Sequence, residues 1–381
     1  MAGRDGTATP PPAEYISSVF EVYEVRTDGD TVLYIGEPNA SGQRMERELW
    51  PVFRERGYDI TLQRGYEPED GLPVSRGEYV LVAEPHSVSV DGIPWTNVTL
   101  FVLTVFSTLF AGAVFWYQVP LTREPWRLLE AWPFMLAIIG VLGIHELGHY
   151  VMSRYHGVKA SLPYFIPVPT YIGSLGAVIK MEGQIPDREA LFDIGVAGPL
   201  AGLVATVVVT AIGLQLDPLS VQQAAVDEGE QMVVFNHPPL LEIIAALTGA
   251  SEQLEDGVVH PVVFGGWVGM LVTLLNMLPV GQLDGGHILR AMVGEKASQI
   301  ARFVPYLLFG LAAYLLILVD GFDSVLIWVI WGVFAIVLAA AGPAHPIDDE
   351  PLDKKRIAIG LLTFVLAALC FTPVPVEIVE P

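Results

Sequence analysis

Long apolar runs are the feature that most limits what this 381-residue chain can fold into. An α-helix rises ~1.5 Å per residue, so about 20 apolar residues cross a ~30 Å hydrocarbon core. Hydrophobic residues make up 52% of the chain and charged residues only 16%, which is more apolar than a soluble protein needs. We therefore predict a mainly α fold, a polytopic membrane helical bundle of about seven spans. The apolar runs cover residues 97–117, 132–153, 191–214, 262–278, 303–319, 325–342 and 356–373.

The first 90 residues follow a different pattern. Several stretches alternate apolar and polar residues, as strands with one buried face do, and residues 43–57 have the spacing of an amphipathic helix. We predict a small soluble α+β domain over 1–90 and a separate membrane domain over 97–373. The predicted strands are FEVYEV (20–25), TVLYIGE (31–37), YDITLQR (58–64) and YVLVAE (79–84).

The charges of the connecting segments predict the orientation. The opening MAGRDGTATPPPAEY has no basic segment followed by an apolar one, so we expect no cleaved signal peptide and a cytoplasmic N-terminus. With that start, the Lys and Arg residues between spans fall on the cytoplasmic side, except for Arg123 and Arg127. This asymmetry agrees with the positive-inside rule. We expect a multi-pass protein of the cell membrane.

The formal net charge of −22 comes from 42 acidic and 20 basic residues. Hydrated carboxylates keep a protein soluble in concentrated salt, so a halophilic source fits this composition, as does an acidic protein with no special habitat. Neither interpretation suits a polyanion, so we expect no nucleic acid as a partner. Cys370 is the only cysteine of the sequence, so no intrachain disulfide is possible.

Three ionisable side chains lie inside the second apolar run, in the stretch HELGH (145–149). A titratable group at membrane depth is costly, so it usually faces the protein interior and has a partner or a task. His145 and His149 share one helix face and can both direct ring nitrogens at Zn²⁺, while Glu146 can take a proton from an attacking water. The alternative is a histidine pair that is hydrogen-bonded across helices.

A catalytic zinc needs a third protein ligand and an open position. The candidate is Asp284, in NMLPVGQLDGGH (276–287), directly after the fourth apolar run. Pro279 and the glycines end the helix there and let the backbone turn a carboxylate toward a neighbour. Asp284 could instead cap the next helix. For His287 we expect a supporting or capping role rather than metal binding.

The motifs HELGH and N-x-x-P-V-G-x-L-D-G-G resemble those of the site-2 protease family of intramembrane zinc metalloproteases, particularly its archaeal and plastid-type members. The likeness covers roughly 130–300, the core of the membrane domain. It implies a metalloprotease domain with one zinc ion per chain. In that family the matching residues serve as zinc ligands, general base and a polar group near the scissile carbonyl. The zinc ligands by this likeness are His145, His149 and Asp284, and the general base is Glu146. The polar group near the scissile carbonyl is Asn276, for which a helix-packing hydrogen bond is the alternative.

Two further segments resemble the family. YIGSLGAVIKMEG (171–183) is too short and glycine-rich to span the bilayer, and resembles a re-entrant hairpin beside the active site. We expect Gly173, Gly176 and Asn276 to contribute to substrate binding. A substrate that pairs as an extra strand with the edge of this hairpin is unwound, and its peptide bonds are open to attack. GVAGPLAG (195–202) has small residues that permit close helix packing.

The resemblance implies an intramembrane zinc endopeptidase that cuts transmembrane substrates near the cytoplasmic side, as in regulated intramembrane proteolysis. The expected partners are transmembrane protein substrates and the lipid bilayer. Two other classes stay open at this point. One is a transporter or ion channel in which the His, Glu and Asp side chains form a polar relay, and the other is a catalytically silent binding scaffold.

Overall fold

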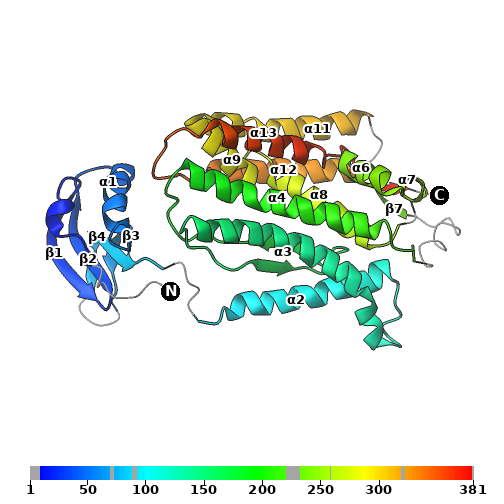
Figure 1. Cartoon of the computed structure of the whole chain (residues 1–381), viewed down its shortest axis with the longest axis horizontal. Helices are drawn as coiled ribbons and strands as arrows, with labels where there is room; N and C mark the ends of the chain where they lie inside the picture. The colour runs from blue at the N-terminus through cyan, green and yellow to red at the C-terminus, as the bar shows by residue number, and fades with distance from the viewer. Residues whose placement is uncertain are drawn as a thin grey trace. The chain divides into compact units, whose positions relative to one another are not determined.

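In a computed structural model the chain divides into two compact units, which are described separately (Figure 1). The first comprises Met1–Ser89 and Pro346–Asp348, and the second comprises Val90–His345 and Asp349–Pro381. The structure describes residues 9–68, 73–87, 92–219, 232–257, 259–318 and 322–379.

The N-terminal unit is a four-stranded antiparallel sheet with one helix against it. The strand order is β1-β2-β4-β3, and each stretch predicted as strand or helix forms one. Val32 and Tyr34 of β2 pack in one buried cluster with Leu49 and Phe53 of α1, because alternate strand residues point to the same face. The elements are η1 (Ala13–Tyr15), β1 (Phe20–Asp28), β2 (Thr31–Pro38), α1 (Gly42–Arg54), β3 (Tyr58–Tyr66) and β4 (Val74–Pro85).

The second unit is mainly helical, with short strands between the helices. Its elements are α2 (Trp95–Ala111), η2 (Gly112–Trp116), η3 (Pro125–Ala131), α3 (Trp132–Tyr155), β5 (Tyr164–Pro167), β6 (Ser174–Val178), α4 (Arg188–Gly213), β7 (Met232–Phe235), α6 (Pro239–Thr248), α7 (Ser251–Glu255), α8 (Val262–Asn276), α9 (Asp284–Val293), η4 (Gly294–Lys296), α10 (Ala297–Ala301), α11 (Val304–Leu318), α12 (Phe322–Ala341), α13 (Lys354–Ala368) and β8 (Val376–Val379).

Three helices among the described residues are long and apolar enough to cross a membrane: Trp95–Trp116, Pro125–Tyr155 and Arg188–Gly213. A fourth candidate is the pair Asp284–Ala301 and Val304–Leu318, which is bent by 54°. Three other apolar helices in that part of the chain are shorter, and α8 is one of them. Apolar helices of membrane type are therefore present as predicted, while the number of seven spans stays a prediction.

Helix α4 is the central element of the membrane unit and packs against α3, α8 and α9. Glycines permit this close approach. A Cβ on Gly148 of α3 would lie 2.6 Å from the Ala197 carbonyl oxygen of α4, and one on Gly265 of α8 would lie 2.6 Å from Cβ of Ala137. Larger side chains would force these helices apart, so the two glycines fix the separation of α3, which carries HELGH, from α4 and from α8.

The segment after α3 forms the predicted hairpin. Strands β5 and β6 are antiparallel, with Tyr164 opposite Val178 and Phe165 opposite Ala177. Gly173, in the turn between them, has a φ of 80°, a conformation that favours glycine. The sheet of β5 and β6 has two strands, so each strand has an edge that no other described strand of this sheet covers.

Candidate active site

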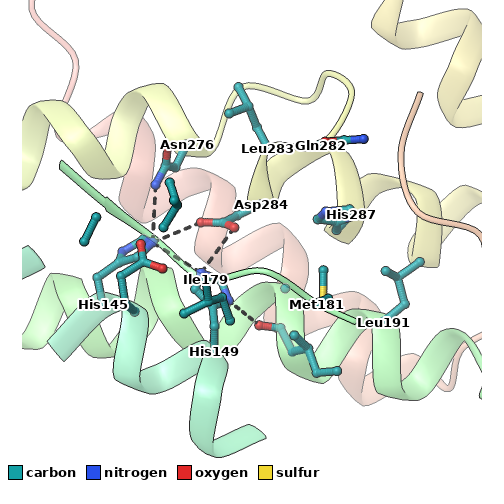
Figure 2. Close-up of a pocket in the computed structure, with 15 residues that line it drawn as sticks. His145, His149, Ile179, Met181, Leu191, Asn276, Gln282, Leu283, Asp284 and His287 are labelled. Carbon is teal, nitrogen blue, oxygen red and sulfur yellow. Dashed lines mark hydrogen bonds and ion pairs between the residues drawn. The ribbon is translucent and has the colours of Figure 1, made fainter. Parts of the chain in front are cut away.

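His145 and His149 point from one face of α3 toward the carboxylate of Asp284 at the start of α9 (Figure 2). The His145 Nε2 lies 3.1 Å from Asp284 Oδ2, and the His149 Nε2 lies 3.2 Å from Asp284 Oδ1. The two Nε2 atoms are 3.3 Å apart. Both histidines are buried. Three side chains that are far apart in the sequence thus converge on one point.

The irregular loop after α8 brings Asp284 to this point. Helix α8 ends at Asn276, and Gly281 in the loop has a φ of 55°. A Cβ on Gly285 or Gly286 would collide with the backbone of the same loop, so the DGG sequence allows a tight turn directly beside the carboxylate. The residue before α9 makes no side-chain capping bond to the helix, and the Asp284 carboxylate faces the histidines instead of capping α9.

The three side chains fit a zinc ion. Ligand atoms ~2.0–2.1 Å from a tetrahedral zinc lie about 3.3 Å from one another, which is close to the separations seen among His145, His149 and Asp284. The Nδ1 of His149 lies 2.7 Å from the Ile194 carbonyl oxygen. Donating its proton there leaves the lone pair of Nε2 for a metal, the usual arrangement of a zinc-bound histidine. Within the described part of the chain, these three residues form the group that could hold a metal.

Glu146 and Asn276 lie beside this cluster. The Glu146 carboxylate is buried and accepts a hydrogen bond from the backbone of Ile179, directly after β6. The Nδ2 of Asn276 is 3.3 Å from His145 Nε2. Both side chains line the same pocket of about 170 Å³ as the metal cluster. The structure therefore brings together all five residues for which the sequence suggests a chemical role.

The hairpin contributes different residues to the pocket from those expected. Gly173 and Gly176 are in the hairpin but not in the pocket lining, which includes Ala177, Val178 and Ile179 instead. These are ordinary apolar residues in an apolar chain, so composition gives no signal for them. The structure shows which residues of this segment line the pocket, and the substrate-binding role of Gly173 and Gly176 stays a prediction.

Two glycines of α4 make room for the histidines. A Cβ on Gly202 would lie 2.8 Å from Nδ1 of His145, and one on Gly198 would overlap the His149 ring. The small residues of GVAGPLAG therefore do more than let two helices pack. They leave the space in which the imidazole rings take their orientation.

His287 lies one helical turn beyond Asp284 and lines the same pocket (Figure 2). It is buried, and its Nδ1 has no hydrogen-bond partner among the described residues. It is not one of the three side chains that converge as metal ligands. The expected supporting role of His287 stays a prediction.

A helix-borne HExxH pair, completed by an aspartate from a broken loop and buried among apolar helices, defines a membrane-embedded metallopeptidase. Residues 133–318 match the model of peptidase family M50. The chain is 30% identical over 389 residues to "Probable zinc metalloprotease EGY1, chloroplastic" of Arabidopsis thaliana. The aligned region covers 92% of this chain and 68% of that relative. The chain therefore belongs to peptidase family M50, the site-2 protease family, as the motifs predict.

Other relatives agree. "Probable zinc metalloprotease EGY2, chloroplastic" of Arabidopsis thaliana is 30% identical over 348 residues, or 89% of this chain and 59% of that relative. "Probable zinc metalloprotease EGY3, chloroplastic" of Oryza sativa subsp. indica is 27% identical over 382 residues, covering 93% of this chain and 62% of that relative. The chain is an M50 metalloprotease with zinc as its cofactor, and these relatives do not favour a transporter or a silent scaffold.

Proposed function

We propose that the protein is an intramembrane zinc endopeptidase that hydrolyses peptide bonds of transmembrane substrates near the cytoplasmic side. The observation that carries the proposal is one pocket among apolar helices that joins a metal cluster to a strand edge. His145, His149 and Asp284 form the cluster, and Val178 at the end of β6 lines the same pocket.

Zinc, when bound, polarises the peptide carbonyl and makes water a better nucleophile. Two histidines and Asp284 would hold the ion. Glu146 takes a proton from the water that attacks the carbonyl carbon, and passes a proton to the amine nitrogen as the C–N bond breaks. Asn276, whose Nδ2 already points into the cluster, is positioned to donate a hydrogen bond to the carbonyl oxygen as charge develops on it.

The hairpin explains how a helical substrate could be cut. Peptide bonds inside a helix are shielded by their own hydrogen bonds, so the substrate has to unwind. An extended segment that pairs with the edge of β6 keeps its backbone groups satisfied within the bilayer, where an unpaired group is costly. Ala177, Val178 and Ile179 would then place the scissile bond beside Glu146.

The proposed topology is that of a cell-membrane protein with seven spans and a cytoplasmic N-terminus. The spans are α2, α3, α4, α8, α11, α12 and α13. One contact supports it. Strand β7, which follows α4, pairs with β8, which follows α13, and seven spans put both strands on the outer side. Lys354 and Lys355 at the start of α13 then lie in the cytoplasm, as the positive-inside rule requires. The net charge of −22 supports a halophilic source.

A Glu146→Gln variant tests this function. The amide keeps the size of the side chain but cannot accept the proton, so we expect about one zinc per chain and a roughly 100- to 10,000-fold loss of cleavage. Zinc is measured by elemental analysis, and cleavage by mass spectrometry of a transmembrane peptide in liposomes. Glu182→Gln is the matched control, since Glu182 pairs with the exposed Lys180. A wild-type protein that holds no zinc and cuts no such peptide would contradict the proposal.

A further inference from the structure

Helix α2 carries none of the metal ligands, yet it is bonded to the hairpin from its first turn onward. Asn97 is buried in that turn. Its Nδ2 donates to the carbonyl oxygen of Leu162 at 2.7 Å and to that of Pro163 at 3.2 Å. Both carbonyls lie in the segment that leads into β5. The base of the hairpin is therefore attached to the start of α2.

The tip of the hairpin is attached to the other end of this span. The Ser107 hydroxyl donates to the Gly173 carbonyl oxygen, and the Trp116 Nε1 donates to the Tyr171 carbonyl oxygen at 3.0 Å. A Cβ on Gly173 would lie 2.5 Å from Cα of Thr108. Gly173 is thus required for the close approach of the turn to α2, while its predicted part in substrate binding stays a prediction.

Ring contacts fill the space between these hydrogen bonds. Phe101 meets Phe165 of β5 with ring centroids 5.3 Å apart, and Phe115 meets Tyr171 at 4.5 Å. Helix α2 packs chiefly against β5, and β5 pairs with β6. The order of elements is therefore α2, β5, β6 and then the pocket.

The donors of α2 and η2 bond to backbone carbonyls of the hairpin. The carbonyls of Leu162, Tyr171 and Gly173 lie outside the β5–β6 pairs. Leu162 also accepts from the Ser161 hydroxyl at 3.0 Å and Gly173 from the Val168 N–H at 3.4 Å. A carbonyl oxygen has two lone pairs, so a further donor is favourable where water is scarce. Asn97 and Ser107 of α2 and Trp116 of η2 supply these donors. This placement favours one position of the hairpin over any displaced one.

We propose that the span Trp95–Trp116, which consists of α2 and η2, is the positioning element of the substrate strand, and that Asn97, Ser107 and Trp116 set the register in which a substrate pairs with β6. This inference rests on the proposed function and adds the residues that decide which bond is presented to Glu146. The three side chains act through the hairpin, so they are positioning residues and not catalytic ones.

A loosened hairpin has two expected effects. Substrate binding weakens while the metal cluster stays intact, so KM rises more than kcat falls. The substrate can also shift along β6 by two residues, because side chains of a strand point to the same face with a period of two. A second cut, two residues from the first, would then appear.

The experiment compares Asn97→Leu, Ser107→Ala and Trp116→Phe in the full chain, with a transmembrane peptide in liposomes as the probe. Loss of one neutral hydrogen bond should raise KM roughly 2- to 10-fold, with zinc content unchanged and displaced cuts seen by mass spectrometry. Ser107→Thr keeps the hydroxyl and should restore the wild-type pattern. The matched control is Thr104→Val, because the buried Thr104 hydroxyl donates only to Leu100 in α2 itself.

The outcomes separate the two proposals. Wild-type KM and a single wild-type cut in all three variants would overturn the positioning role while leaving the protease intact. Equal effects of Thr104→Val and the three variants would overturn it as well, since they would report a general loss of α2 packing. A wild-type chain that fails to cut the peptide would instead contradict the proposed function.

Discussion

Two walls of the pocket are built and fastened in different ways. The catalytic wall consists of the α3, α4 and α9 residues that line the pocket, among them His149, Ile194 and Asp284. The hairpin wall consists of Ala177, Val178, Ile179 and Met181. The catalytic wall is made of closely packed helices, whereas the hairpin wall is part of a two-stranded sheet fastened to α2 by neutral hydrogen bonds and ring contacts.

Partly buried ion pairs reinforce the catalytic wall, whereas the Lys180–Glu182 pair beside the hairpin wall is more exposed and 3.7 Å long. Asp193 of α4 lies 3.0 Å from His156 Nε2, just after α3, and 2.9 Å from Arg356 Nε of α13. Asp349, before α13, accepts from Arg188 of α4 at 2.7 Å and from Arg290 of α9 at 2.9 Å. Charge-assisted hydrogen bonds are roughly twice as strong as neutral ones.

The difference suggests a division of roles. Damage to the catalytic wall should change whether the metal is held and how stable the protein is. Damage to the hairpin wall should change how tightly the substrate binds and where it is cut. The following predictions test the first half of this comparison, and the variants of α2 test the second.

The largest effect is expected for Gly198→Ala. The new methyl group would occupy the space of the His149 ring, so the imidazole has to turn away from Asp284. We expect zinc affinity to fall by about 100-fold or more, since even changes in groups that only orient a ligand cost 10- to 100-fold. Competition with a chelator measures this.

Gly140→Ala on α3 is the control, because a Cβ at Gly140 meets no atom within 4 Å. It should bind zinc as the wild type does. If Gly198→Ala kept its zinc but cut at a displaced bond, the assignment of separate roles to the two walls would be wrong.

Asp193→Ala should have the next largest effect. It removes the carboxylate that His156 and Arg356 share, and leaves Arg356 with Glu189 as its partner on α4. We expect the free energy of unfolding to fall by about 1–3 kcal/mol, the range for hydrogen bonds to charged groups. Denaturant titration in detergent measures the change. Unchanged stability would mean that the helix packing alone fixes this wall.

A smaller, pH-dependent effect is expected at Asp349. The Arg188 guanidinium, and then that of Arg290, lower the pKa of this carboxyl from 3.8 to about 2. Because the folded-state pKa is lowered, the contribution to stability is complete above the ordinary value near 4 and is lost as the pH falls toward 2. Asp349→Asn should remove this part of the acid sensitivity. The free energy of unfolding of the wild type and of Asp349→Asn is measured between pH 6 and 2. Parallel curves for the two proteins would contradict the prediction.

The residues of the metal cluster could be predicted from the sequence, because metal binding restricts strongly which residue types can serve as ligands and at what spacing. Few arrangements explain two histidines and a glutamate inside an apolar run, and DGG after a proline-broken helix supplies the missing carboxylate. The attachment of α2 could not be predicted in this way. Asn97 and Trp116 are unremarkable residues at the ends of an apolar run, and their partners follow by more than 50 positions.

The sequence alone also does not determine the number of membrane spans. Apolar runs indicate where the chain avoids water, but α8 is an apolar helix of only 15 residues, and the pair of α9–α10 and α11 is bent. Apolar length alone does not separate a full span from a short buried helix. Contacts between distant segments, such as β7 with β8, are needed to decide it.

The central claim is that the metal ligands come from two distant segments, His145 and His149 on α3 and Asp284 at the start of α9. X-ray absorption spectroscopy of the zinc-loaded protein tests it most directly. We predict two imidazole nitrogens and a carboxylate oxygen at ~2.0–2.2 Å from zinc, with the spectrum altered and zinc weakly held in Asp284→Ala. A sulfur ligand from Cys370, or an unchanged spectrum in Asp284→Ala, would contradict the account.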